Sequence, residues 1–404
     1  MRSYAVRYAR DPRSDGRGAG AIIDIPEKRA IISGIGISRI GRKTGIAGSD
    51  LTAESTRAAI ADAGLTPADI DGIASLGDTP IDEVAALLGI APTFTASDGF
   101  GRQGLLTPVA DAAGAVAGGR ARHVLVYRTV QMIGGTLDSG PDRGQAMPKV
   151  LLDVIPLMTF NAFSAANWLG LHCHRHMHLY GTTKEQLGWL AVTSRRHAGL
   201  NPRAVFRDPM TLDDYLRARP ISSPFGLYDC DVPIDGSIAF VVSTADHAAD
   251  CPQPPVRFEA IGGSDGDGGW FHRPDFPKMA SVDAAAEMWA RTDLTPADLD
   301  VAQLYDGFTY ITFAWLEALG ICGDGEAGPF VEGGTRIALD GQLPLNTYGG
   351  QLSAGRMHGY WVLHEACVQL RGEGGERQVA GDPEVAVAAA GGGPIAGCML
   401  LTRG

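Results

Sequence analysis

Apolar residues run along the chain in short segments that alternate with helical patterns. An alanine-rich stretch at 107–118 and an apolar stretch at 359–371 have the length of helices, and each precedes an apolar run. Nearly continuous apolar runs of this kind are typical of strands buried on both faces. These strand-like runs lie at 30–41, 123–132, 232–244, 256–270 and 384–393. The order strand, helix, strand, helix, strand in each half predicts two parallel or mixed sheets with helices on their faces, an α/β fold.

An internal repeat organises the chain. The segment ADAGLTPADID at 61–71 recurs as ARTDLTPADLD at 290–300, and seven of the eleven positions are identical. In each copy a helical pattern ends and a threonine followed by proline, at Thr66 or Thr295, begins a new turn before an apolar run. A common capping motif can produce such a pair by chance. Strand-like runs that break into glycine precede both copies, however, so the sequence predicts two duplicated halves.

The segment between the halves has its own character. It is rich in Met and Phe, then carries a helical pattern at 180–198, and the strand at 232–244 returns the chain to the core of the first half. Five arginines among Gly, Asp and Ser mark the N-terminus as a solvated tail or a partner-binding arm. The expected division is a flexible basic tail at 1–28, an N-terminal half at 29–132 plus 231–250, an inserted loop subdomain at 133–230 and a C-terminal half at 251–404.

Composition narrows the class of protein. Of 404 residues, 45% are hydrophobic and 20% are charged, which is typical of a globular α/β protein with a sizeable core. The 34 basic and 46 acidic residues give a net charge of −12, so the whole chain lacks the charge of a nucleic-acid binder. No apolar run reaches the length of about 20 residues that crosses a bilayer, and the N-terminus has no signal-peptide pattern. We therefore expect a cytoplasmic protein.

The cysteines do not form a recognisable metal or disulfide pattern. They are scattered along the chain without a C-x-x-C pair, so reduced thiols are expected. The six positions are Cys173, Cys230, Cys251, Cys322, Cys367 and Cys398.

Several strings together resemble the lipid-transfer-protein branch of the thiolase superfamily, over residues 30–404. They are YGTTKEQL, RRHAGLNPRA, ISSPFGLYDCDVPIDGSIAFVV, QLYDGFTYITFAWLEALGICGDGEAGPF and NTYGGQLSAGRMHG. The resemblance implies a thiolase-like fold of duplicated α/β halves, layered α-β-α-β-α, with an inserted loop subdomain that contacts CoA. It also implies a dimer, and we expect its interface at the strand near 123–132.

The catalytic residues of the thiolases are absent from the matching positions. The family places a nucleophilic cysteine in the region that here spans 96–112, which contains none. Without a thiolate, covalent acyl transfer by the usual route is excluded. Tyr305-Asp306-Gly307-Phe308 stands where the family has His-Asp-Cys-Phe, and Gly355-Arg356-Met357 stands at its Gly-His-Pro motif. The last Cys-x-Gly-Gly-Gly motif becomes Ala389-Ala390-Gly391-Gly392-Gly393.

Two tyrosines occupy these catalytic positions, Tyr305 and Tyr348, and this combination resembles the steroid side-chain-cleaving aldolases. The resemblance implies retro-aldol cleavage of a β-hydroxyacyl-CoA, with no cofactor beyond the CoA that belongs to the substrate. Such a reaction needs a base for the β-hydroxyl, donors for the thioester enolate and an acid. We expect Tyr348 to be the base and Tyr305 the donor and acid, with Arg356 or His358 as the cation that favours a phenolate.

Other residues of the same motifs are expected to contact the substrate or its oxyanion: Asp306, Asn346, Gly349, Gly350 and Gly392. Each assignment has a structural alternative. A loop tyrosine is often only packed, Arg356 is equally well explained by a structural salt bridge, and His358 lies two positions from the family histidine.

Two further motifs invite a ligand. LHCHRHMH at 171–178 places His172 and His176, or His174 and His178, on shared helix faces, a spacing found in zinc sites. The glutamate of a zinc-protease motif is missing, so we expect a packed or CoA-facing helix and no metal. GGSDGDGG at 262–269 lacks the Lys-Ser/Thr ending of a phosphate loop.

Two other functions stay open at the level of the sequence. One is a non-catalytic acyl-CoA or lipid-binding protein, and the other is a thiolase-type acyltransferase with a displaced cysteine. The family resemblance further implies a homodimer that binds a small partner protein with an OB-fold and a zinc ribbon, as a heterotetramer.

Overall fold

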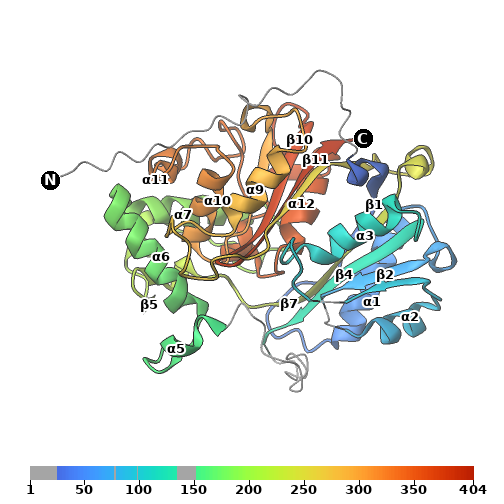
Figure 1. Ribbon diagram of the computed structural model, residues 1–404, viewed down its shortest axis with the longest axis horizontal. Coiled ribbons are helices and arrows are strands. Elements are labelled where there is room, and N and C mark those ends of the chain that lie inside the picture. The colour runs from blue at the N-terminus through green and yellow to red at the C-terminus, as the bar shows by residue number, and fades with distance from the viewer. Residues whose placement is uncertain (1–24, 77–78, 98, 134–151) are drawn as a thin grey trace.

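The computed structural model describes residues 25–76, 79–97, 99–133 and 152–404 (Figure 1). The expected basic tail therefore lies outside the described residues, apart from positions 25–28.

The first half alternates strands and helices up to the insertion. A later strand, β7, follows the insertion and completes this half. The elements are β1 (Ala30–Ile37), α1 (Gly48–Asp62), β2 (Gly72–Ser75), α2 (Ile81–Leu88), β3 (Phe94–Ala96), α3 (Thr107–Ala117), β4 (His123–Gln131) and β7 (Asp235–Thr244).

The second half repeats the plan with one strand fewer among the described residues. Its elements are β8 (Val256–Gly263), α9 (Ser281–Trp289), β9 (Val301–Leu304), α10 (Thr309–Ala318), α11 (Ala327–Val331), α12 (Tyr360–Leu370), β10 (Val385–Gly392) and β11 (Ile395–Arg403).

The strands of both halves are hydrogen-bonded into one mixed sheet in the order β3-β2-β4-β7-β1-β8-β11-β10-β9. From the centre outward, β1-β7-β4-β2 in the first half corresponds to β8-β11-β10-β9 in the second. The prediction of two parallel or mixed sheets with helices on their faces was therefore right about the kind of sheet and wrong about the number, since the strands of both halves form one sheet. The first strands of the two halves pair antiparallel at Ile31–Arg257 and Ile32–Val256, and this short contact joins the halves.

Helices lie on both faces of the sheet and between its halves, which gives the expected alternation of layers (Figure 1). Helix α3 contacts strands of the first half, and α12 contacts β9, β10 and β11 together with β1 and β7. Helices α1 and α2 cover the opposite face of the first half, where Leu125 and Tyr127 of β4 alternate with Val124 and Val126, which face the larger core.

The duplication predicted from the repeat is confirmed. The string at 61–71 ends α1, forms the short turn Pro67–Asp69 and leads into β2, and the string at 290–300 follows α9, forms Pro296–Asp298 and leads into β9. In both turns the threonine and the aspartate three residues later cap each other. The amide of Thr66 donates to Asp69 over 2.8 Å, and that of Thr295 to Asp298 over 2.7 Å.

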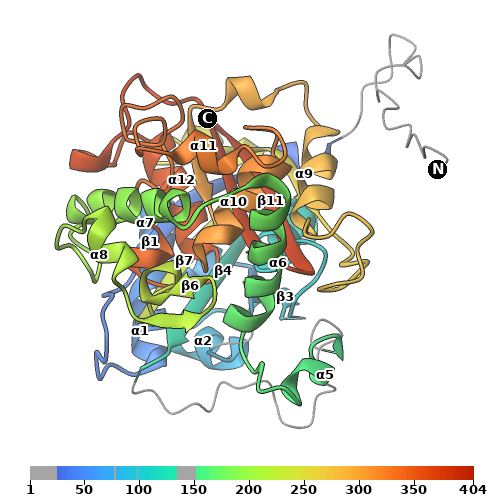
Figure 2. The same ribbon diagram turned by 90° about the vertical axis from the view of Figure 1, so that its left-hand side faces the viewer.

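The insertion packs on the second half, although the chain enters it from the first (Figure 2). Its helix α7 contacts α10 and α11, which brings the insertion over the ends of β9 and β10. The elements of the insertion are α5 (Ile155–Met158), α6 (Ala165–Tyr180), α7 (Lys184–Gly199), α8 (Leu212–Leu216), β5 (Pro220–Ser222) and β6 (Phe225–Gly226). Within the described residues, no helix is long and apolar enough to cross a membrane.

The expected dimer strand at 123–132 does not lie at an edge. It forms β4, an inner strand that pairs with β2 on one side over Val124–Tyr127 and with β7 on the other side over His123–Gln131. The prediction that two chains pair through this strand was wrong. Among the described strands, β3 and β9 are the two at the ends of the sheet.

Glycines in the first strand of each half allow a helix to pack against the sheet. A Cβ at Gly34 would lie 2.1 Å from the carbonyl oxygen of Ala59 on α1, and a Cβ at Gly262 would lie 2.0 Å from that of Ala284 on α9. The same constraint therefore recurs in both halves, because each helix backbone lies directly on the strand.

We expect Gly34→Ala and Gly262→Ala each to lower the free energy of unfolding by about 1–3 kcal/mol, because the added methyl group overpacks the helix–sheet contact. Gly114→Ala is the control, since the exposed Gly114 of α3 has open space around the added carbon and gains helix propensity. Urea midpoints measure the effect. Equal stability of all three variants would contradict the proposed packing constraint.

Candidate active site

A cavity of about 180 Å³ lies where the insertion meets the ends of β9 and β10. Its polar side chains are Tyr305, Asp231 and Arg356. The remaining lining is apolar or glycine: Leu105, Ala165, Leu169, Trp270, Gly307, Phe308, Ile311, Gly391, Gly392 and Ile395. The residues that line this cavity include no cysteine, so it offers no thiolate for covalent acyl transfer.

Tyr305 is held at the cavity by the strand that precedes it. It follows β9 directly, and its amide donates to the carbonyl oxygen of Ala389 on β10 over 2.9 Å. Burial, and then the charge of Asp231, raises the pKa of the Tyr305 phenol. The phenol is therefore uncharged near pH 7 and acts as a hydrogen-bond donor.

Gly307, where the thiolases carry a cysteine, makes room for this tyrosine. A Cβ at position 307 would lie 2.5 Å from Cε1 of Tyr305 and 3.2 Å from its hydroxyl oxygen. The Tyr305 ring thus fills the space that a side chain at 307 would need, and the two departures from the thiolase motif depend on each other.

Asp231 is a site residue that sequence reasoning missed. Its amide donates to the carbonyl oxygen of Gly307 over 3.1 Å, which places the carboxyl group beside Tyr305. Burial raises the pKa of Asp231 to about 6, although the nearby guanidinium of Arg356 opposes the shift. The only signal in the sequence was a second acidic residue in the string YDCDVP.

Arg356 fits both of its predicted interpretations. Its Nη1 lies 3.3 Å from Oδ1 of Asp231, so the arginine forms a salt bridge, and it also lines the cavity. Its Nε lies 3.3 Å from the sulfur of Met132. The positive charge is therefore available beside Tyr305, in a position that favours negative charge on a bound thioester oxygen.

His358 is not a cation, which corrects one of its two predicted roles. Its removal from water, and then the guanidiniums of Arg128 and Arg356, lower its pKa well below the usual value. The Nη2 of Arg128 lies 2.9 Å from Nδ1 of His358, so the neutral ring accepts a hydrogen bond from an arginine of the first half.

Tyr348 is fully buried, and it is not among the residues that line the cavity. Its ring stacks on Trp361 with 5.3 Å between the ring centres, and its hydroxyl has no hydrogen-bond partner in the described part of the chain. Burial, then the charges of Asp306 and Glu365, raises its pKa well above the usual value. A resting phenolate at Tyr348, as the sequence suggested, is therefore not favoured.

Most of the expected oxyanion residues have structural contacts instead. The side-chain amide of Asn346 accepts a hydrogen bond from the backbone nitrogen of Leu304 over 2.7 Å and donates one to the carbonyl oxygen of Leu304 over 2.9 Å. Asp306 is buried, and this burial raises its pKa to about 7. Its carboxyl group accepts a hydrogen bond from the backbone amide of Gln351 over 2.8 Å. Gly392 does line the cavity.

The two glycines of this loop allow close packing. A Cβ at Gly350 would lie 2.0 Å from Oδ2 of Asp306, and one at Gly349 would lie 2.5 Å from Cβ of Ala198. Both have a positive φ, of 105° at Gly349 and 63° at Gly350, which favours glycine.

The histidines of the 171–178 cluster point to separate partners. The Nδ1 of His172 lies 3.0 Å from the carbonyl oxygen of Pro277, and Nε2 of His174 lies 3.0 Å from the Ser223 hydroxyl. His176 lies 3.0 Å from Glu317. The segment is part of helix α6, and His172 and His176 are buried in it. Of the two expected arrangements, a packed helix or a helix that faces CoA, these contacts fit the packed helix.

The cysteines are poor nucleophiles. Burial raises the pKa of all six thiols, to about 12 for Cys230, the one adjacent in sequence to Asp231. A displaced nucleophile is therefore not supported.

Comparisons with known proteins place the chain in a family. A model of the family described as thiolase C-terminal domain-like matches residues 267–401. The 17-hydroxy-3-oxo-4-pregnene-20-carboxyl-CoA lyase of Mycobacterium tuberculosis is 36% identical over 390 residues, which cover 92% of this chain and 99% of that protein. A steroid side-chain-cleaving aldolase of Thermomonospora curvata is 35% identical over 384 residues, 92% of this chain and 97% of that one.

Solved structures show the same relationship. The Ltp2-ChsH2(DUF35) aldolase superposes with a TM-score of 0.86 at 33% identity, over 93% of this chain and 98% of that one. A monomeric SCP2-thiolase-like protein of Mycobacterium smegmatis has a TM-score of 0.71 at 17% identity, over 93% of this chain and 77% of that one, and shares the fold. The chain therefore belongs to the steroid side-chain-cleaving aldolases, a family of carbon–carbon lyases built on the thiolase fold.

Proposed function

We propose that this protein cleaves the β-hydroxyacyl-CoA thioester of a steroid side chain by a retro-aldol reaction, giving a ketone and a shorter acyl-CoA. The observation that carries the proposal is a cavity in which Tyr305, Asp231 and Arg356 meet between apolar walls. Apolar walls suit a steroid ring system, and the relatives named as steroid lyases cover the chain over almost its whole length.

The reaction balances without a co-reactant. A base removes the proton of the β-hydroxyl group, the Cα–Cβ bond breaks, and its electron pair moves onto Cα and the thioester oxygen as an enolate. A proton returned to Cα then completes the acyl-CoA. The β-carbon leaves as a ketone, so CoA enters only as part of the substrate.

We assign Tyr305 as the donor to the thioester enolate and as the acid. It is uncharged, it lines the cavity, and the guanidinium of Arg356 lies in the same lining. For the base we replace the expected phenolate by the Asp231 carboxylate, because a group with a pKa of about 6 is ionised at neutral pH.

Tyr348 keeps a place in the proposal as a hydrogen-bond donor to the substrate. Burial, then the charges of Asp306 and Glu365, and after them Tyr305 and Asp231, raise its pKa, so its hydroxyl keeps the proton that a donor needs. A buried hydroxyl that has no partner among the described residues costs stability, which is typical of a group kept for a ligand.

The protein is further proposed to work as a homodimer with a small OB-fold, zinc-ribbon partner, as a heterotetramer. Support comes from the solved aldolase, whose name contains a second protein, ChsH2(DUF35).

Tyr305→Phe should lower turnover of a steroid β-hydroxyacyl-CoA by about 100- to 10,000-fold, because it removes the proton donor and keeps the ring. Binding of the acyl-CoA should persist in a calorimetric titration. Tyr180→Phe, outside this cavity, is the matched control and should stay active. Full carbon–carbon cleavage by Tyr305→Phe would assign the donor and acid to another group, whereas binding without any cleavage by the unaltered protein would favour the non-catalytic binding protein.

Tyr348→Phe should raise the free energy of unfolding by about 1 kcal/mol, since it removes a buried hydroxyl for which the described part of the chain offers no partner. Turnover should nevertheless fall by about 100-fold or more if that hydroxyl serves the substrate. Thermal unfolding and steady-state kinetics on the same samples separate the two effects. A variant that is more stable and fully active would show that Tyr348 only packs.

Activity should fall as the pH drops through about 6, the pKa of Asp231, because protonation removes the base. Above that pH the carboxylate is present and turnover should level off, since the raised pKa of Tyr305 keeps its proton in place. Asp231→Asn should lose about 100-fold in turnover, and its residual activity should no longer depend on pH between about 5 and 7. An unchanged acid limb in Asp231→Asn would assign the base to another group.

A further inference from the structure

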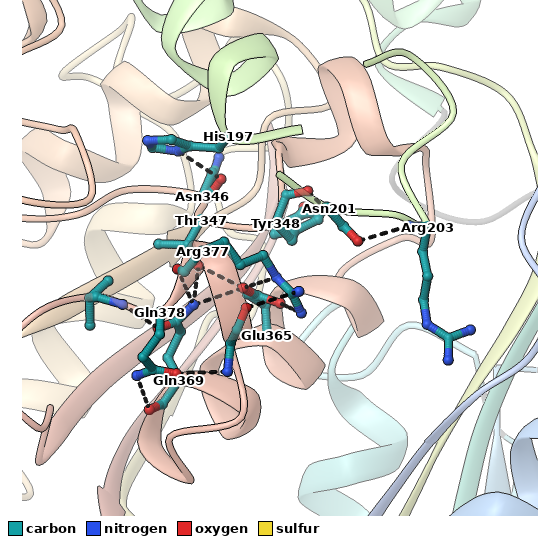
Figure 3. Close-up of polar contacts among 12 residues, drawn as sticks. His197, Asn201, Arg203, Asn346, Thr347, Tyr348, Glu365, Gln369, Arg377 and Gln378 are labelled. Atoms are coloured by element: carbon teal, nitrogen blue, oxygen red, sulfur yellow. Dashed lines mark hydrogen bonds and ion pairs between the residues drawn. The ribbon is translucent and has the colours of Figure 1, made fainter. Parts of the chain in front are cut away.

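A buried ion pair that does not line the cavity lies under the loop of Tyr348. Glu365 of α12 is fully buried. Arg377 donates to both of its oxygens, from Nε to Oε1 over 2.9 Å and from Nη2 to Oε2 over 3.1 Å (Figure 3). Such a two-point contact fixes the carboxylate in orientation as well as in place.

Thr347 connects this ion pair to the loop. Its hydroxyl accepts from Nε2 of Gln303 over 2.8 Å and from Nε2 of Gln369 over 3.1 Å, and it lies 2.8 Å from Oε1 of Glu365. Because amide nitrogens only donate, the single proton of the hydroxyl is left for the Glu365 carboxylate. The hydrogen bond from Thr347 to Glu365 therefore has a defined direction.

The same helix also supports the ring of Tyr348. Trp361, which stacks on that ring, precedes Glu365 by four residues on α12, and residues at this spacing share one helix face. One helix face thus supports both Thr347 and Tyr348, two consecutive residues of the loop. Asn201 completes the support, since its Nδ2 donates to the carbonyl oxygen of Tyr348 over 2.9 Å (Figure 3).

We propose that Thr347 and Glu365 are positioning residues, which hold the Tyr348 hydroxyl where the substrate meets it. The inference rests on the proposed function of Tyr348 as a donor to the substrate. The geometry is that of a rigid support, because the glutamate, the threonine and both glutamines are buried on a helix, a strand and a loop that pack together.

The charge of Glu365 has a second consequence. Together with burial and the charge of Asp306, it raises the pKa of Tyr348, so the hydroxyl keeps its proton. The ion pair thereby supports a donor in both position and protonation state.

Thr347→Val tests the inference, because valine keeps the shape of threonine and removes the hydroxyl. We expect kcat for the steroid β-hydroxyacyl-CoA to fall by about 10- to 100-fold with little change in KM, as a small displacement of a catalytic group does. Thr347→Ser, which restores the hydroxyl, should recover most of the turnover. Thr193→Val is the matched control, since the Thr193 hydroxyl on α7 is buried without a partner among the described residues and has no hydrogen bond to Thr347 or Glu365 there.

A double-mutant cycle separates positioning from general stability. In a Tyr348→Phe background, Thr347→Val should cause no further loss of kcat, because the hydroxyl that it positions is already gone. Thr347→Ala, which adds no bulk, is the second variant and should behave in the same way if the valine variant does not fold.

Two results would overturn the inference. One is full kcat in folded Thr347→Val and Thr347→Ala, and the other is a loss that multiplies with that of Tyr348→Phe. If Tyr348→Phe alone keeps full turnover, the proposed role of Tyr348 fails and the positioning role fails with it. If Tyr348→Phe is inactive while Thr347→Val is fully active, only the positioning role is lost.

Discussion

The site depends on how the chain closes the end of the sheet at β9. Among the described strands, none pairs with the outer side of β9. The loop from Leu345 onward covers this side, first through a parallel bridge between Ala302 and Leu345 and then through the side chain of Asn346. The amide of Asn346 pairs with the nitrogen and the oxygen of Leu304, as a neighbouring strand would. Tyr305 directly follows Leu304, and Tyr348 lies two residues after Asn346. The contact between Asn346 and Leu304 therefore sets the position of the two tyrosine segments relative to each other.

Space in the site is as constrained as hydrogen bonding. A thiolase places a histidine and a cysteine where this chain has Tyr305 and Gly307, and the ring of the tyrosine takes the volume in which a side chain at 307 would stand. A change at one position therefore requires a change at the other. The exchange places a neutral donor at Tyr305, and the region at 96–112 lacks the nucleophilic cysteine. A reaction without a covalent intermediate is the chemistry that these changes allow.

Asp231 in the cavity lining and two residues of the loop of Tyr348 carry groups whose burial is unfavourable. Burial raises the pKa of Asp231 to about 6, and the hydroxyl of Tyr348 and the side-chain amide of Gln351 have no partner among the described residues. Each of these features costs stability in the absence of a ligand. They lie together beside a π-helical turn at Gly350–Ala354, a form of helix often found at functional sites. Buried ion pairs such as that of Glu365 with Arg377 lie next to this loop. Their rigid packing keeps the unpaired groups in place.

The sequence by itself determined the duplicated fold and part of the site. The repeat at 61–71 and 290–300, the apolar runs and the capping threonines depend on local patterns, which is why the strands and helices of both halves were predictable. Tyr305 and Arg356 followed from motif positions, and both line the cavity. Only the tertiary structure decided that β4 is an inner strand, because pairing depends on the order of strands in the sheet. It also decided that Asp231 faces Tyr305, that Asn346 supports a strand and that His358 is neutral, because contacts between segments distant in the chain and removal from water leave no trace in local patterns.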